Sequence, residues 1–187
     1  MSSPTVDLTF VHEWKAEILP ARPAILPARH FAYPLQVEEV ERGALEVLIR
    51  PPVASPFLAT CALGFRDPIV PTGIWSAPNL VEICVMSGGY AYIIDTTDPT
   101  QFTMLPYRPV LQIHPAKDSR LLLFVGHRDI LAWGEEGQAW QSAKLSDEGV
   151  SVTSIENTIV RGTGWNMIAD KETPFTLDLK DGSLHRD

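Results

Sequence analysis

Cysteine is scarce in this chain of 187 residues, which contains only Cys61 and Cys84. Each lies within an apolar run, which argues against the disulfide framework of small secreted domains and predicts buried free thiols. Long apolar runs are also missing, and the N-terminus has no basic region followed by an apolar core. No stretch approaches the length needed to span a bilayer, so we expect a cytoplasmic protein with no membrane partner.

Basic residues are outnumbered. The chain has 15 Lys and Arg against 23 Asp and Glu, a net charge of −8 and a pI near 5.1. Binding to a phosphate backbone relies on clustered positive charge. The composition therefore argues against nucleic acid as a partner.

Helical periodicity is the third absence, because no stretch shows three turns of it with caps. Instead, 16 prolines and 12 glycines separate many short apolar runs, which is typical of strands and turns. Residues 82–95 are expected to form two strands joined at Gly88-Gly89, and Gly134 to Gly137 to form another turn. Leu121 to Val125 should be a strand buried on both faces. The sequence predicts an all-β fold.

A degenerate repeat is the most informative pattern that is present. A glycine is followed by strand-forming residues four to six positions later and by an aromatic residue thirteen or fourteen positions later. The four glycine and aromatic pairs are Gly43 and Phe57, Gly88 and Phe102, Gly126 and Trp140, and Gly162 and Phe175. Such spacing is typical of repeated supersecondary units, although an irregular all-β domain would also give it.

Three segments resemble the ends of β-propeller blades. Residues 130–140 combine an apolar strand, an acidic glycine turn and an aromatic outer strand, while residues 92–99 and 177–182 are similar to the same region of quinoprotein-like blades. The resemblance, which also extends to WD-like blades, covers roughly residues 80–183. It implies antiparallel, propeller-blade-like repeats.

Two parts of the chain are expected to differ in organisation. The Pro-rich residues 1–36 predict an extended N-terminal arm that lies on the domain or reaches a partner. Residues 37–187 are expected to form a single all-β domain with about four blade-like repeats, or else an irregular β-sandwich or barrel. Four repeats leave little more than three strands each, so the domain is either a small imperfect propeller or curved stack, or is completed by a second chain.

No motif carries convincing chemistry. His127-Arg128-Asp129 spells the catalytic triplet of protein kinases, but no phosphate loop accompanies it, and a polar turn is the better interpretation. A nucleophilic Cys84 beside a histidine is disfavoured by its mid-strand position. The five histidines lack metal-ligand spacing, and Asp95 and Asp98 favour a turn over a calcium loop. We therefore predict no metal and no cofactor.

Binding is the function that these absences leave. Trp75 is the first candidate, because its Pro-rich surroundings place it in an exposed loop. His127, Arg128 and Asp129 are further candidates on a turn. We expect a cytosolic protein-binding or scaffold module with a protein partner, and homo-oligomerisation as a second expectation. The alternatives are a small-ligand or carbohydrate binder, or an enzyme whose active site leaves no local motif, such as one formed by His127, Asp129, Asp95 and Arg161.

Overall fold

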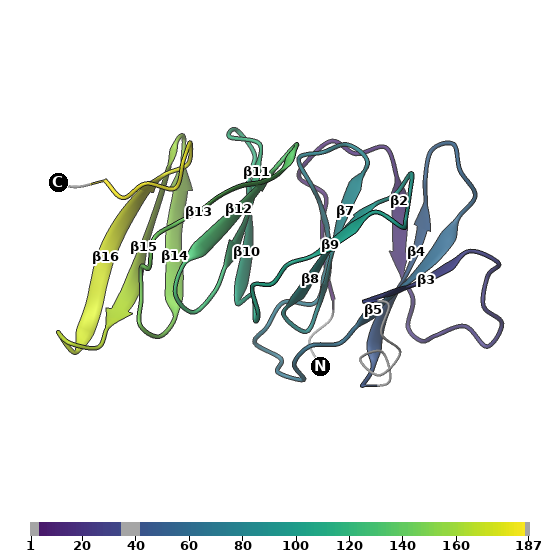
Figure 1. Ribbon diagram of the computed structural model, residues 1–187, viewed down its shortest axis with the longest axis horizontal. Coiled ribbons are helices and arrows are strands. Elements are labelled where there is room, and N and C mark those ends of the chain that lie inside the picture. Colours follow the sequence, from purple (N-terminus) through teal and green to yellow (C-terminus); the bar gives the residue numbers. More distant parts are fainter. Residues whose placement is uncertain (1–3, 35–41, 186–187) are drawn as a thin grey trace. The chain divides into compact units, whose positions relative to one another are not determined.

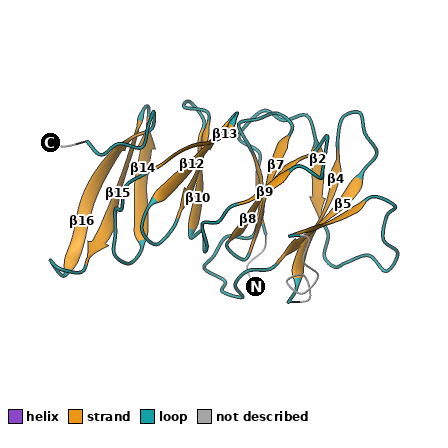
Figure 2. Ribbon diagram, in the orientation of Figure 1, coloured by secondary structure: helices purple, strands orange, loops and turns teal. Residues whose placement is uncertain are grey.

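The computed structural model describes residues 4–34 and 42–185. Within these ranges the chain forms sixteen strands in four sheets and no helix, as Figure 2 shows. The predicted all-β class is confirmed. No helix in the described ranges combines the length and apolar character that crossing a membrane would require.

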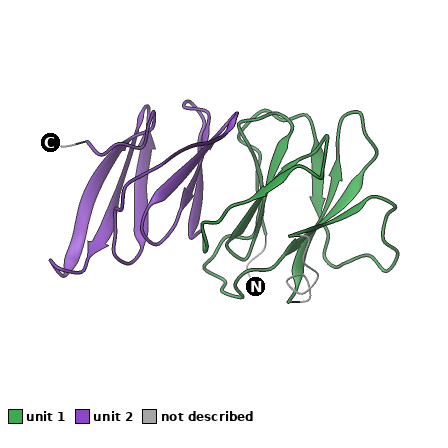
Figure 3. Ribbon diagram, viewed as in Figure 1, with its two compact units in different colours: residues 1–109 green, residues 110–187 purple. Residues whose placement is uncertain are grey.

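The chain divides into two compact units, residues 1–109 and residues 110–187 (Figure 3). A single domain over residues 37–187 was expected. Each unit contains two sheets, and the chain passes from one unit to the next only once.

Unit 1 holds sheets A and B (Figure 1). Sheet A has the order β1-β6-β7-β8-β9, with β1 Thr5–Asp7, β6 Gly73–Ser76, β7 Glu82–Ser87, β8 Tyr90–Asp95 and β9 Phe102–Met104. Sheet B has the order β2-β4-β5-β3, with β2 Lys15–Ile18, β4 Ala44–Arg50, β5 Phe57–Ala62 and β3 His30–Tyr33. β1 and β3 pair in parallel with their neighbours, and the other pairs are antiparallel.

Unit 2 holds sheets C and D, and in both the spatial order of the strands follows the chain. Sheet C contains β10 Gln112–Ala116, β11 Leu121–Val125, β12 Ile130–Gly134 and β13 Gly137–Gln141. Sheet D contains β14 Val150–Glu156, β15 Ile159–Asn166 and β16 Lys171–Asp178. All five residues of β11 are buried, as the sequence predicted.

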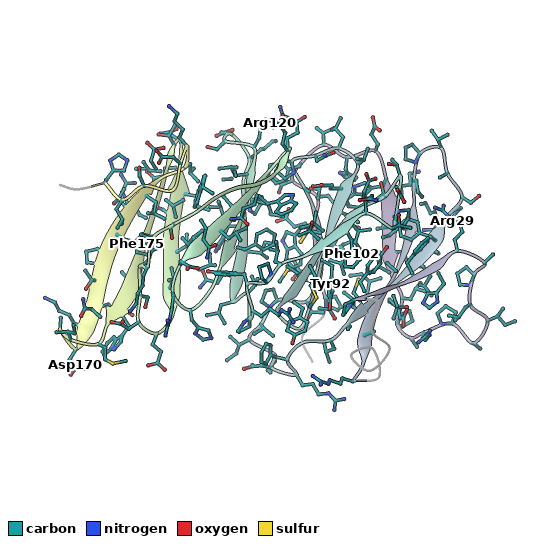
Figure 4. All side chains as sticks on the ribbon, viewed as in Figure 1. Arg29, Tyr92, Phe102, Arg120, Asp170 and Phe175 are labelled. Atoms are coloured by element: carbon teal, nitrogen blue, oxygen red, sulfur yellow. The ribbon has the colours of Figure 1, made fainter. Side chains whose placement is uncertain are left out.

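Alternating apolar residues of the described strands form a core in each unit. In unit 1, Val47 and Ile49 of β4 join Val85 of β7 and Tyr92 of β8 between sheets A and B. In unit 2, Leu123, Trp140, Val160 and Phe175 join sheets C and D. Figure 4 labels Tyr92 and Phe102 in unit 1 and Phe175 in unit 2.

The N-terminal segment supplies strands to both sheets of unit 1. We expected residues 1–36 to form an extended arm; their described part is extended and provides β1, β2 and β3. Trp14 is 2% exposed, and its indole N–H donates to the Glu82 carbonyl at 3.0 Å. Apolar burial thus holds this segment against the rest of the unit.

The two turns predicted at glycines, between β7 and β8 and between β12 and β13, are confirmed. Gly88 and Gly89 have φ of 58° and 77°, and they join Ser87 to Tyr90 in a two-residue hairpin. Positive φ at both central residues is what such hairpins need. Gly134 and Gly137 pair across the predicted turn between β12 and β13.

The four copies of the sequence pattern do not occupy equivalent places. Gly43, Gly88 and Gly126 each precede a strand, whereas Gly162 lies inside β15 and pairs with Phe175. The strand that contains Gly162 ends at Asn166, and Ile168 is 98% exposed in the following turn. The aromatic residues of all four copies nevertheless lie in or against the two cores.

Candidate functional site

Trp75 does not stand in an exposed loop, and that expectation is wrong. It lies in β6, where it pairs with Cys84 on one side and Asp7 on the other, and it is 4% exposed. The surrounding prolines suggested a loop, but a four-residue strand fits between them and gains partners from β1 and β7. Its ring therefore offers no surface platform.

The His127-Arg128-Asp129 turn joins β11 to β12 and binds the segment that follows sheet C. The Arg128 carbonyl accepts from Leu145 N–H at 2.7 Å, and the His127 carbonyl accepts from Gly149 N–H at 2.8 Å. Gln141 donates to the Asp129 carboxylate at 3.1 Å. The His127 and Arg128 side chains are exposed, and Asp129 is half-buried. These bonds give the turn a structural role in unit 2.

The cysteine thiols and the Asp95 carboxylate, which were candidates for catalysis or metal binding, have structural roles. Cys61 and Cys84 are buried and free, and burial raises the pKa of both thiols, which disfavours the nucleophilic thiolate. The Asp95 carboxylate accepts from Thr97 and Asp98 N–H groups, so it closes the predicted turn. Over residues 4–34 and 42–185, no group of three or more His, Cys, Asp or Glu side chains is placed to hold a metal ion.

Unit 1 contains a groove between described residues of its two sheets. It has a volume of about 1350 Å³ and is lined by residues of β1, β2, β4 and β6 and of the connection from β5 to β6. Apolar side chains line much of it, including Val6, Ile18, Leu45, Leu63, Phe65 and Val70. Val6 and Phe65 are 56% and 43% exposed, so apolar surface faces solvent here.

The outer edge of β2 borders this groove, and no other described strand pairs with it. β2 is the edge strand of sheet B, and its register pairs Ile18 with Val47. Leu19 N–H donates to the Glu46 carbonyl at 2.8 Å, which fixes the phase of the ladder. Bonded and non-bonded pairs alternate, so the N–H and C=O groups of Ala16 and Ile18 point away from β4.

β1 borders the same groove with its own outer edge. Thr5 N–H donates to the Thr72 carbonyl at 2.9 Å, and Thr5 pairs in parallel with Gly73. The backbone groups of Val6 therefore point away from β6. Two strand edges, one from each sheet, thus border a single apolar groove.

The charged residues of the groove are unequally engaged. Glu17 forms an ion pair with Arg50 at 3.2 Å, and Glu46 is 6% exposed and accepts from the Thr60 hydroxyl at 2.6 Å. By contrast, Arg22, Arg42 and Arg66 form no ion pair with any described residue. The described lining of the groove thus holds these three arginines and the three carboxylates of Glu17, Glu46 and Asp67.

Another edge of the molecule is blocked in a way that the β2 edge is not. In β16, the Leu179 N–H donates to the Thr158 carbonyl, which fixes the residues whose backbone groups bond to β15. The backbone N–H and C=O groups of alternate residues from Glu172 to Asp178 therefore point away from β15. Pro174 occupies one outward position and has no N–H to offer. The outward groups of Thr176 and Asp178 are bonded to His185 and Ser183. β16 is thus protected against pairing, whereas the edge of β2 is open beside the groove.

None of these groove residues was predicted from the sequence. The N-terminal prolines predicted an extended arm in place of β2. The direction of the β2 backbone groups depends on its pairing with β4, which lies more than twenty residues away. The one available signal is the alternation of polar and apolar residues in Lys15-Ala16-Glu17-Ile18, which is typical of a strand with one buried face.

Comparison with known proteins identifies no relative of this chain. A scan against models of known protein families finds no match to the chain, and a search of curated proteins finds none that matches.

Proposed function

We propose that this chain is a cytosolic protein-binding module that takes an extended segment of a partner protein by strand addition to the outer edge of β2. The observation that carries the proposal is the open backbone edge at Ala16 and Ile18 beside an apolar groove. In strand addition, main-chain hydrogen bonds supply affinity, and neighbouring pockets read alternate side chains of the ligand.

The size of the groove favours a peptide over a small molecule. Its volume of about 1350 Å³ exceeds the roughly 300–1000 Å³ that is usual for small-ligand pockets. The carbohydrate alternative rested on an aromatic platform at Trp75, whose ring is buried.

The order of strands supports blade-like sheets in unit 2. Sheets C and D are antiparallel meanders in chain order, the arrangement that a propeller blade also has. Sheets A and B, which border the groove, each include one strand paired in parallel. On this proposal, the sheets are rigid blade-like units, and unit 1 uses its N-terminal strands for binding. A rigid framework avoids the conformational cost of ordering the protein's own strands on binding.

Peptide selection tests the proposed function. A random-peptide phage library is selected on the immobilised full-length protein, and enriched sequences are synthesised for calorimetry. Ala16→Pro removes an outward N–H without breaking the ladder to β4, while the matched control Ala16→Ser keeps it. We expect Ala16→Pro to weaken binding about fivefold, since one hydrogen bond contributes about 1 kcal/mol. Ala16→Ser should bind as the wild type does. An absence of enriched peptides, or equal binding to Ala16→Pro, contradicts the proposal.

A further inference from the structure

Little apolar burial holds strand β1 on sheet A. Val6, the apolar residue of the strand, is 56% exposed, and the described core of unit 1 does not include it. β9, the opposite edge strand of the same sheet, also has three residues, but its Phe102 and Met104 pack against that core. Fixing each residue of a strand costs backbone entropy, and apolar burial offsets this cost in β9 but hardly in β1.

The residues that follow β1 are anchored more firmly. Phe10 is 7% exposed, and its N–H donates to the Ser76 hydroxyl at 2.9 Å. Trp14 is buried and bonded to the Glu82 carbonyl. Between β1 and these anchors, the Asp7 carboxylate accepts from Thr9 N–H at 3.0 Å and closes a turn. β1 can therefore leave β6 about this turn while the rest of the segment stays in place.

β6 provides a fitted position for β1. Thr5 N–H donates to the Thr72 carbonyl at 2.9 Å, and Thr5 pairs with Gly73. A Cβ at position 73 would lie 2.0 Å from the Thr5 carbonyl oxygen, so the strand can approach this closely only because this residue is glycine. In this position Pro4 and Val6 line the groove. Docked β1 is thus one wall of the groove.

We propose that β1 is a latch, which opens often in the free protein and is held on β6 when an extended segment of a partner occupies the groove. This proposal rests on the strand addition to β2 proposed above. A bound segment would cover the exposed side chain of Val6 and offer partners to its outward N–H and C=O groups. The segment therefore supplies stabilisation that β1 lacks alone, and its binding shifts β1 toward the docked position.

Hydrogen exchange of the full-length protein, followed by NMR, tests the latch without a ligand. The N–H groups of Thr5 and Asp7 face β6, and those of Thr103 and Leu105 face β8, so the two edge strands of sheet A can be compared directly. After correction for local sequence, we expect Thr5 and Asp7 to exchange at least about tenfold faster than Thr103 and Leu105. Equal protection of the two strands would overturn the proposal.

A peptide from the phage selection tests closure. At saturation it should raise the protection of Thr5 and Asp7 at least about tenfold, and leave that of Thr103 unchanged. Thr5→Pro removes the N–H that bonds to Thr72 without altering β6, and the matched control Thr5→Ser keeps it. Thr5→Pro should bind the peptide about fivefold more weakly than Thr5→Ser, because docking of β1 loses a hydrogen bond.

The outcomes separate the latch from the proposed function. A bound peptide that leaves the protection of β1 unchanged, or that binds the two Thr5 variants equally, would overturn the latch and leave strand addition to β2 standing. If the selection yields no peptide, strand addition is wrong and the latch is wrong with it.

Discussion

At the scale of single residues, the backbone conformation of a few turn positions limits stability. Arg120, Asn157 and Asp170 adopt positive φ of 52°, 50° and 49°, a region that costs side chains energy and suits glycine. Each lies in a hairpin turn of unit 2, and Figure 4 labels Arg120 and Asp170. The Arg120 side chain forms an ion pair with Glu135, whereas the Asp170 side chain has no hydrogen bond or ion pair with a described residue.

Asp170→Gly is expected to raise the free energy of unfolding by up to about 1 kcal/mol, because glycine removes the strain at this φ. Urea unfolding measures the change. Asp170→Val should lower stability, since a β-branched side chain tolerates positive φ least. Equal stability of the two variants would show that the turn relaxes.

Gly162→Ala is expected to destabilise unit 2 by about 1–3 kcal/mol through overpacking. A Cβ at Gly162 would lie 2.3 Å from the Ser151 carbonyl oxygen and 2.5 Å from Cζ of Phe175. Gly134→Ala is the matched control, because its Cβ would meet nothing closer than 3.6 Å. Thermal unfolding of the two variants gives the comparison. Similar melting temperatures would contradict the close packing of Phe175 on β15.

At the scale of elements, β10 carries a histidine that links stability to pH. Burial lowers the pKa of His114 below its ordinary value of 6.5, so the folded protein binds this proton less readily than the unfolded chain. Above pH 6.5 both states are neutral at this residue and it has no effect. Below pH 6.5 the unfolded chain takes up the proton first, so stability falls until the pH has passed the pKa of the folded state.

His114→Gln should therefore reduce the loss of stability on acidification. Urea unfolding at about pH 7.5 and at about pH 5.5 measures the loss for each protein. The control is His127→Gln, which changes an exposed histidine in the same unit. If His114→Gln and the wild type lose the same stability between these pH values, burial of His114 does not contribute to the pH dependence.

The edge of β16 gives a second prediction for an element. Pro174→Val restores an outward N–H on that edge and should increase self-association, because unprotected edges pair with other strands. Thr173→Val is the matched control, since the Thr173 N–H faces β15. Light scattering at increasing protein concentration distinguishes them. Association of the Thr173 variant to the same extent would point to hydrophobicity, and not to the edge.

The sequence could predict those turns and strands that are determined by residues adjacent in the chain. Gly88-Gly89 and the Gly134 to Gly137 turn follow from residues that are adjacent in the chain, and β11 follows from its apolar run. Trp75 was misplaced because four residues of strand between prolines carry almost no pattern. The open edge of β2 was out of reach, because the direction of its backbone groups depends on pairing with a strand distant in the sequence.

At the scale of the whole molecule, the net charge of −8 and the pI near 5.1 predict colloidal behaviour. Solubility should be lowest near the pI, where repulsion between molecules vanishes. Turbidity across a pH series measures the minimum. The variant with Lys117→Glu and Lys180→Glu should move it to lower pH. A minimum that stays in place would mean that a local surface, and not net charge, controls association.

Sheet A also has a consequence for the order of events during synthesis. Its first strand comes from residues 5–7 and its other strands from residues 73–104. At roughly 5–20 residues per second, the ribosome makes the first strand several seconds before the sheet that receives it. Residues 5–7 therefore leave the ribosome before the strand that pairs with them exists, and sheet A is complete only after β1 docks on β6.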